Sequence, residues 1–252
     1  MKTAKTFLSV IIIIAGFCSC HSARSVQLLL NKQCVDLDYE LISTVFEGER
    51  DKTVYLNFID NSKMEQHTVV KNGSVLVLPF FLYNYWHKKF NIVLGEHTLS
   101  QPYREFLADA LLAECNRSAS FSLKMNADES LPNYTLDVQI IRNKTRSGIQ
   151  ETNTIFIVPI LFSDDFDVII TNNYHVLPTS SDLEIAVFLK KDSLSLLEKK
   201  YNSHQYFKYK SYGDLLDTNE KCVYKMTQCL AFATEQIVTD ICRDLNLILS
   251  AQ

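Results

Sequence analysis

The residue types that perform catalysis or bind metals are present in the chain, but not in the spacings that those chemistries need. The six histidines are at positions 21, 67, 87, 97, 175 and 204, and none belongs to an HExxH motif or stands four residues from another ligand. The sequence also lacks the GxSxG turn of serine hydrolases and the glycine-rich loops of nucleotide-binding proteins. We therefore name no catalytic residue, and we expect a protein that is not an enzyme and holds no metal or other cofactor.

One group of carboxylates could in principle bind calcium. Asp164, Asp165 and Asp167 stand close together in the sequence. They lack the ligand spacing and the central glycine of an EF-hand loop. A solvated turn is the favoured interpretation of this group.

One aromatic and basic group is a candidate for contact with a partner. Tyr83, Tyr85 and Trp86 precede His87-Lys88-Lys89. Aromatic rings and cations are favoured at membrane interfaces, and aromatic residues dominate the energetics of protein interfaces. Exposed turn residues are an alternative explanation. We take Tyr83, Tyr85 and Trp86 as the candidate partner contact.

The first twenty residues have the layout of an export signal. Lys2 and Lys5 are followed by an apolar run over residues 7–17, which is too short to span a bilayer, where about 20 residues are needed. Cys18-Ser19-Cys20 comes next, and Ser19 is the small residue that precedes the lipidated cysteine of bacterial lipoproteins. We therefore predict a signal peptide over residues 1–19 and a lipid on Cys20.

A lipid on Cys20 would hold the chain on a membrane, because each buried methylene contributes about 0.8 kcal/mol and several acyl chains bind firmly. Residues 20–35 would then be a lipidated tether and residues 36–252 a single domain. The alternative is an ordinary signal peptide cleaved slightly later in a secreted eukaryotic protein. In that case glycans could be carried by the Asn-X-Ser/Thr triplets at Asn72, Asn116, Asn133 and Asn143.

The charge balance argues against nucleic acid as a partner. The chain has 25 Lys and Arg against 29 Asp and Glu, a net charge of −4. Removal of residues 1–19 takes away Lys2 and Lys5 and leaves −6. Nucleic-acid binding needs a basic face. We expect the partners to be a membrane, reached through the lipid, and a protein of the cell envelope.

Five cysteines follow the signal region, at positions 34, 115, 222, 229 and 242. An exported protein enters a compartment where disulfides can form, but an odd number leaves at least one thiol unpaired within the chain. Cys222 and Cys229 are separated by about 10 Å along a predicted helix and cannot bond each other. The sequence leaves open which cysteines pair, and inert buried thiols are an equally good interpretation.

Apolar runs predict a sheet from residue 36 onward. Residues 37–41 and 54–58 alternate between apolar and polar side chains around a polar turn, which predicts a hairpin. A second hairpin is predicted from apolar runs at 155–162 and 166–170. Further strands are predicted at residues 75–82, 90–94, 134–140, 183–189 and 194–209.

Two segments predict helices. Ser100 is a suitable N-cap, Pro102 fits the first turn, and apolar residues recur at helical spacing from Tyr103 to Leu111. The last and longest helix follows Asp217, a second candidate cap. Its apolar stripe is predicted to pack in the core and consists of Val223, Met226, Leu230, Ala233, Ile237, Ile241, Leu245 and Ile248.

The order of these elements resembles that of a class of exported bacterial lipoproteins. The class includes the auxiliary lipoproteins of ABC-type envelope transporters, the lipopolysaccharide-assembly lipoproteins and the N-terminal fold of the curli-secretion lipoprotein. The resemblance spans about residues 70–250 and implies a C-terminal helix packed across a sheet. It is carried by a buried strand at Val75–Leu82, a helix at Ser100–Asn116, a strand at Tyr134–Arg142 and a hairpin at Leu183–Tyr209.

Together these patterns predict an α+β fold with a mainly antiparallel sheet and two principal helices packed on one face. The expected function is that of a membrane-anchored, non-enzymatic scaffold or accessory subunit of a transport or assembly complex. Its expected location is the envelope of a Gram-negative bacterium, with the outer membrane favoured over the inner one. The alternatives are an oligomeric pore component that contributes an amphipathic hairpin from residues 152–162 and 166–175, and a secreted hydrolase with an unrecognised site.

Overall fold

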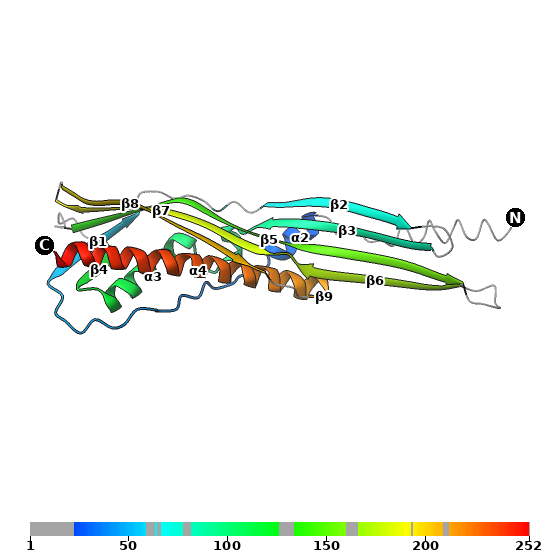
Figure 1. Ribbon diagram of the computed structural model, residues 1–252, viewed down its shortest axis with the longest axis horizontal. Coiled ribbons are helices and arrows are strands. Elements are labelled where there is room, and N and C mark those ends of the chain that lie inside the picture. The colour runs from blue at the N-terminus through cyan, green and yellow to red at the C-terminus, as the bar shows by residue number, and fades with distance from the viewer. Residues whose placement is uncertain are drawn as a thin grey trace.

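The computed structural model describes residues 23–58, 64, 67–77, 82–125, 134–159, 166–192, 194–208 and 212–251. The fold is α+β, as predicted, and nine strands of the described residues join in one sheet. The spine of this sheet is a single long hairpin (Figure 1). One side of the hairpin is β5 (Tyr134–Pro159), and the other side is β6 (Phe166–Val176) followed by β7 (Thr179–Lys191). The predicted hairpin around residues 160–165 is confirmed, because Pro159 pairs with Phe166.

One half of the spine belongs to what we call the body. Here the strand order is β4 (Phe121–Met125), β1 (Lys52–Phe58), the first half of β5, β7 and β8 (Leu194–Phe207). The predicted return of the chain beside Leu183–Leu189 is confirmed by the antiparallel pairing of β7 with β8.

The other half of the spine belongs to what we call the arm. It consists of β2 (His67–Val77), β3 (Leu82–Val93), residues 149–159 of β5, and β6, all antiparallel to their neighbours. The two-residue strand β9 (Tyr212–Gly213) adds to β6 at the base of the arm. The far ends of these four strands extend beyond the last turn of any helix in Figure 1.

The sheet is mixed, which corrects the prediction of a mainly antiparallel one. β1 runs parallel both to β4 and to β5. Parallel neighbours need a crossover, and the helix α3 (Tyr103–Ser118) lies in the connection between β1 and β4. In the sequence this strand–helix–strand unit is hidden, because the hairpin of β2 and β3 is inserted between β1 and α3.

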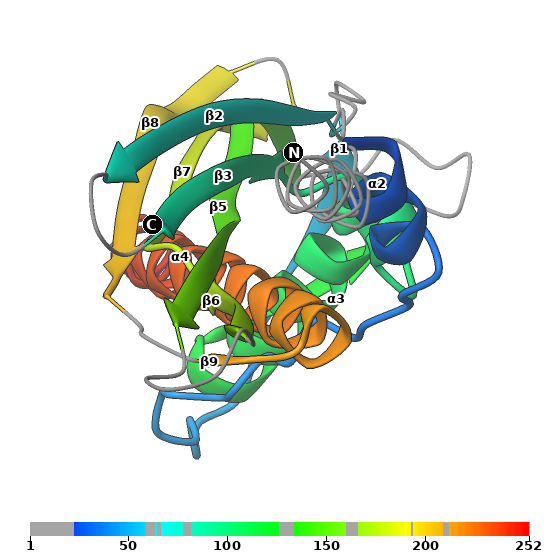
Figure 2. The same cartoon turned by 90° about the vertical axis from the view of Figure 1, so that its right-hand side faces the viewer.

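One helix, and not two, makes the main packing on the sheet. The helix α4 (Leu215–Ser250) has 36 residues and is about 54 Å long. It lies along β5, β7 and β8, whereas α3 packs mostly on α4 and β4. Viewed down the long axis, the sheet arches over α4, with α3 at its side (Figure 2). No helix within the described ranges is long and apolar enough to cross a membrane.

The apolar stripe of α4 forms the centre of the core, as predicted. Seven of its members are buried: Val223, Met226, Leu230, Ala233, Ile237, Ile241 and Leu245. The helix begins earlier than expected. Asp214 is its N-cap and accepts a hydrogen bond from the backbone N–H of Asp217 at 2.8 Å, so Asp217 lies within the first turn. The other helix begins after Pro102 and not at Ser100.

The N-terminal segment differs most from its prediction. Residues 20–35 were expected to be a tether, but residues 23–30 form the helix α2 (Ala23–Leu30), and Val26 and Leu30 are buried in the core. Residues 37–41 do not form the predicted strand. They instead run along α3, with Leu37 buried and the ring of Tyr39 edge-on to Phe106 of that helix.

A candidate partner-binding groove

Several residues singled out in the sequence lie outside what the structure describes. Cys20, Asp164 and Asp165 are not among the described residues. Tyr83, Tyr85 and Trp86 belong to β3 in the arm, where their backbones pair with residues 74–77 of β2 and 153–156 of β5. Their side chains, like that of Asp167 in β6, are also outside the description. Their roles stay predictions.

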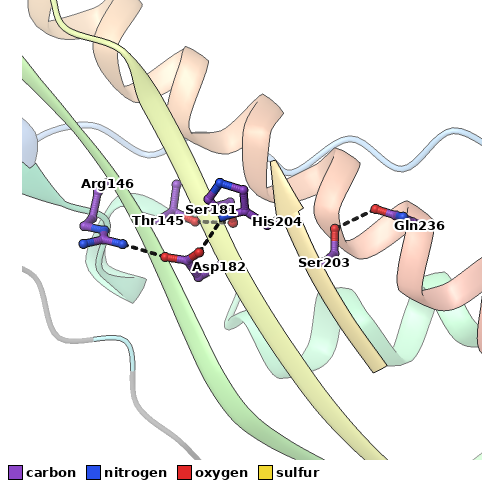
Figure 3. Close-up of polar contacts among 7 residues, drawn as sticks. All are labelled: Thr145, Arg146, Ser181, Asp182, Ser203, His204 and Gln236. Carbon is purple, nitrogen blue, oxygen red and sulfur yellow. Dashed lines mark hydrogen bonds and ion pairs between the residues drawn. The ribbon is translucent and has the colours of Figure 1, made fainter. Parts of the chain in front are cut away.

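A histidine, an aspartate and an arginine meet on the outer face of the body (Figure 3). Asp182 on β7 accepts a hydrogen bond from Arg146 at 2.6 Å and lies 2.6 Å from Nδ1 of His204 on β8. Burial opposes ionisation of Asp182, but the hydrogen bonds and charges of His204 and Arg146 outweigh it and lower its pKa. The group is a cross-strand ion-pair cluster.

This cluster is not arranged like a nucleophilic triad. The hydroxyl nearest in sequence to His204 is Ser203, which points to the opposite side of β8. There it donates to the side-chain oxygen of Gln236 on α4 at 2.8 Å. Adjacent residues of a strand face opposite sides of the sheet, so Ser203 and His204 cannot act together. The polar groups in Figure 3 are best explained as contacts between strands and helix.

The five cysteines within the described ranges form one disulfide and three thiols. Cys115 on α3 and Cys242 on α4 are bonded, with their Cα atoms 5.4 Å apart. Cys222 and Cys229 are buried and separate, as predicted, and burial raises the pKa of each to about 12. Thiols with such pKa values are not thiolates at neutral pH and are unreactive. Cys34 is exposed.

The segment 35–46, which contains the predicted strand at residues 37–41, is fixed along α3. The buried carboxylate of Glu114 accepts hydrogen bonds from the Tyr39 hydroxyl and the Ser43 backbone N–H, both at 3.1 Å. Phe46 N–H donates to the carbonyl of Arg117 at 2.9 Å. These contacts hold residues 35–46 along α3, and we call this segment the wall. Its side chains that face away from α3 therefore have defined positions.

A groove runs between this wall and β8, with the outer side of α4 as its floor. We call it the acidic groove. One of its two hollows is lined by Asp36, Asp38 and Glu40 of the wall and by Tyr224, Phe232 and Glu235 of α4. The other shares Phe232 and Glu235 and adds Ile42, Phe207, Gln236 and Asp240. Phe232 joins the two hollows and packs edge-on against Phe207, with ring centroids 5.7 Å apart.

The floor of the acidic groove exposes aromatic surface. Tyr224 is 50% exposed and Phe232 is 49% exposed. Both residues lie on the far side of α4 from the buried stripe. Two half-exposed rings beside a hollow are typical of contact sites, because aromatic residues bury large areas at a small entropic cost.

The acidic groove is also electrostatically uncompensated. Asp240 is paired with Arg243 at 2.7 Å. In the described part of the chain, no cation forms an ion pair with Asp36, Asp38, Glu40 or Glu235. Partial burial, followed by the carboxylates of Glu40 and Glu114, raises the pKa of Glu235 above its ordinary value. The groove thus holds a negative potential that a cationic partner would relieve.

The carboxylates are spread along the groove. Among the described residues, no three His, Cys, Asp or Glu side chains come close enough together to hold a metal ion. The spacing favours a ligand whose charges are also spread out.

The acidic groove is not among the sites predicted from the sequence, although the sequence contains two signals for it. Tyr224 and Phe232 fall outside the apolar stripe of the last helix, so a helix buried by that stripe must expose them. Asp36, Asp38 and Glu40 alternate with Leu37 and Tyr39, which places the three carboxylates on one side of an extended segment. Only the fold brings the two sets together.

Comparisons with known proteins add a similarity in structure. No family model matches the sequence, and no curated protein matches it. The chain is similar to the crystal structure of a protein from Xanthomonas campestris, assigned to the family DUF330, with a TM-score of 0.45. The two are 10% identical, and the match covers 87% of this chain and 97% of that one.

Proposed function

We propose that the protein is a membrane-anchored lipoprotein of a Gram-negative cell envelope, placed on the outer membrane in preference to the inner one. Its role is that of a non-enzymatic scaffold or accessory subunit of a transport or assembly complex. The observation that carries the proposal is the acidic groove. It combines exposed aromatic rings, four carboxylates that pair with no cation of the described part of the chain, and a wall held in place by hydrogen bonds.

The disulfide supports the exported location. Disulfides persist in oxidising compartments and are rare in the cytosol. The Cys115–Cys242 bond joins α3 to α4 across a separation of 127 residues, so it fixes the helix that forms the floor of the groove. A structural bond of this kind agrees with the export signal that the first twenty residues predict.

The anchor can be tested directly in cells. Cys20→Ser should abolish incorporation of a labelled fatty acid and should release the protein from membranes or stall its processing, because Cys20 is the acceptor in the proposal. Cys18→Ser is the matched control and should leave labelling intact. Labelling that survives in Cys20→Ser and is lost in Cys18→Ser would move the lipid to Cys18.

The scaffold role predicts a dominant protein partner. Crosslinking in intact cells should capture one major envelope protein, and Phe232→Ala should reduce this capture while the protein remains folded. Tyr85→Ala combined with Trp86→Ala tests the contact proposed on β3 in the same experiment. Appreciable hydrolysis of a lipid, glycan or peptide by the purified protein would contradict a non-enzymatic role.

A second candidate function is an oligomeric pore component, and the arm favours it. β2, β3 and β6 have 11, 12 and 11 residues and lie with β5 in one antiparallel sheet that passes the end of α4. Strands of about 9–11 residues are long enough to cross a membrane. This role predicts a ring of several copies in detergent and ion conductance in lipid bilayers. A monomer without conductance would exclude it.

A further inference from the structure

We propose that the acidic groove binds an extended segment of a partner protein that carries lysine or arginine side chains around an apolar residue. This inference rests on the proposed function, because it names the chemistry of the partner that the scaffold would hold. The occupant is defined by three properties of the groove: its charge, its aromatic floor and its length.

The charge of the groove selects a cationic partner. Asp36, Asp38 and Glu40 on the wall face the same space as Glu235 on α4. Within the described ranges these four carboxylates have no cation paired with them. Anionic lipid headgroups and nucleic acids would be repelled. A metal ion is disfavoured because no three potential ligands converge among the residues that the structure describes.

The aromatic floor selects a partner that also has an apolar side chain. Phe232 lies where the two hollows meet, and about half of its surface is open. An apolar side chain placed there would remove that surface from water. Cations beside Phe232 and Tyr224 would also contact the faces of the rings, which attract ammonium and guanidinium groups.

The length of the groove selects an extended segment. The floor from Tyr224 to Asp240 measures about 24 Å along the axis of α4. An extended segment of about seven residues has this length. Such a segment presents alternate side chains to the floor and the wall, so a Lys-apolar alternation would match both surfaces.

The test measures the binding of defined peptides to the full chain in non-ionic detergent. The probe is a fluorescent seven-residue peptide that alternates lysine and leucine, and its counterpart has glutamate in place of lysine. Fluorescence anisotropy should show binding of the lysine peptide at least about tenfold tighter than that of the glutamate peptide. Binding should weaken severalfold between about 50 and 500 mM NaCl, because salt screens exposed charges.

Variants locate the binding. Glu40→Gln combined with Glu235→Gln should weaken binding of the lysine peptide by about tenfold, since two exposed charge pairs are lost. Phe232→Ala should weaken it by a similar factor at every salt concentration. The matched control is Glu49→Gln combined with Glu198→Gln, which changes the net charge equally at exposed positions outside the groove. The control should bind within about twofold of the unchanged protein, since surface charges away from the groove contribute little.

Three kinds of result would overturn the inference: non-specific binding, self-association through the groove, and binding to anionic membranes through the groove. Equal affinity for the two peptides, or an equal loss in the control variant, would show that binding is non-specific. Self-association that the groove variants abolish would make a second copy of the chain the occupant, and binding to vesicles with anionic lipids through the same residues would make it a membrane. Unchanged thermal midpoints in all variants establish that the differences are not caused by unfolding.

The inference and the proposed function fail separately. If no peptide binds while crosslinking in cells still captures one dominant envelope protein, the scaffold role stands and the groove is not its site. If the lysine peptide binds as expected while Cys20→Ser leaves fatty-acid labelling unchanged, the groove is confirmed and the lipid anchor is wrong.

Discussion

The body and the arm share β5, yet the inward side chains of this strand change their chemistry from one region to the other. At the body end they are Leu136, Val138 and Ile140, all buried. Past Ile149, where the arm begins, they are Glu151 and Asn153, which are also buried. Asn153 donates to the carboxylate of Glu151 at 2.9 Å, so these polar groups are partnered and not left isolated.

The difference follows from what covers the strand. The body lies over α4, whose apolar stripe requires apolar partners. α4 begins at Leu215, beside the short strand β9 at the base of the arm. Beyond that point the sheet continues past the helix, and its strands are held mainly by their pairing with one another. One hairpin can therefore run through both regions, because its inward side chains are apolar where α4 covers them and include polar residues where the helix ends.

The largest expected effect is in the body. Cys115→Ala combined with Cys242→Ala removes a bond that closes a loop of 127 residues, and it should lower the free energy of unfolding by about 4 kcal/mol. Chemical denaturation with and without a reductant measures this change. The reductant should destabilise the unchanged protein by a similar amount and should not affect the double variant. Equal stabilities of all four samples would mean that the bond does not hold the body together.

A second effect tests the covering helix itself. Ile237→Ala should cost about 2–5 kcal/mol, because the side chain is 1% exposed and the substitution leaves a cavity. Leu247→Ala on the same helix is the control. Its side chain is 63% exposed, and the change should stay within about 0.5 kcal/mol. If the two variants denatured at the same midpoint, α4 would not be the layer that stabilises the body.

The smallest effect is expected in the arm. Tyr174 on β6 is buried, and its pKa is raised to about 12 by burial and by the carboxylate of Glu151, to which it is hydrogen-bonded. Tyr174→Phe removes that bond and should cost about 1–2 kcal/mol. Hydrogen exchange should show faster exchange of arm amides and little change in α4. A uniform increase across the whole chain would show that arm and body unfold as one unit.

The sequence by itself determined the elements whose signal is local. The apolar stripe from Val223 to Leu245 predicted the long helix and its buried face, because helical spacing is a property of neighbouring residues. The hairpins of β5 with β6 and of β7 with β8 were also correct. In both, an apolar run leads into a short polar turn, and the chain returns beside that run after the turn.

Only the tertiary structure decided the features that join distant segments. The parallel pairing of β1 with β4 and β5, the Cys115–Cys242 bond and the acidic groove each depend on residues far apart in the chain. The alternation at residues 36–40 separates an apolar side from an acidic one, but it does not identify the surface that covers the apolar side. A local pattern specifies which face is buried, and it does not specify the partner. Here the partner of that face is α3 and not a strand, and this packing brings the carboxylates beside the aromatic residues of α4.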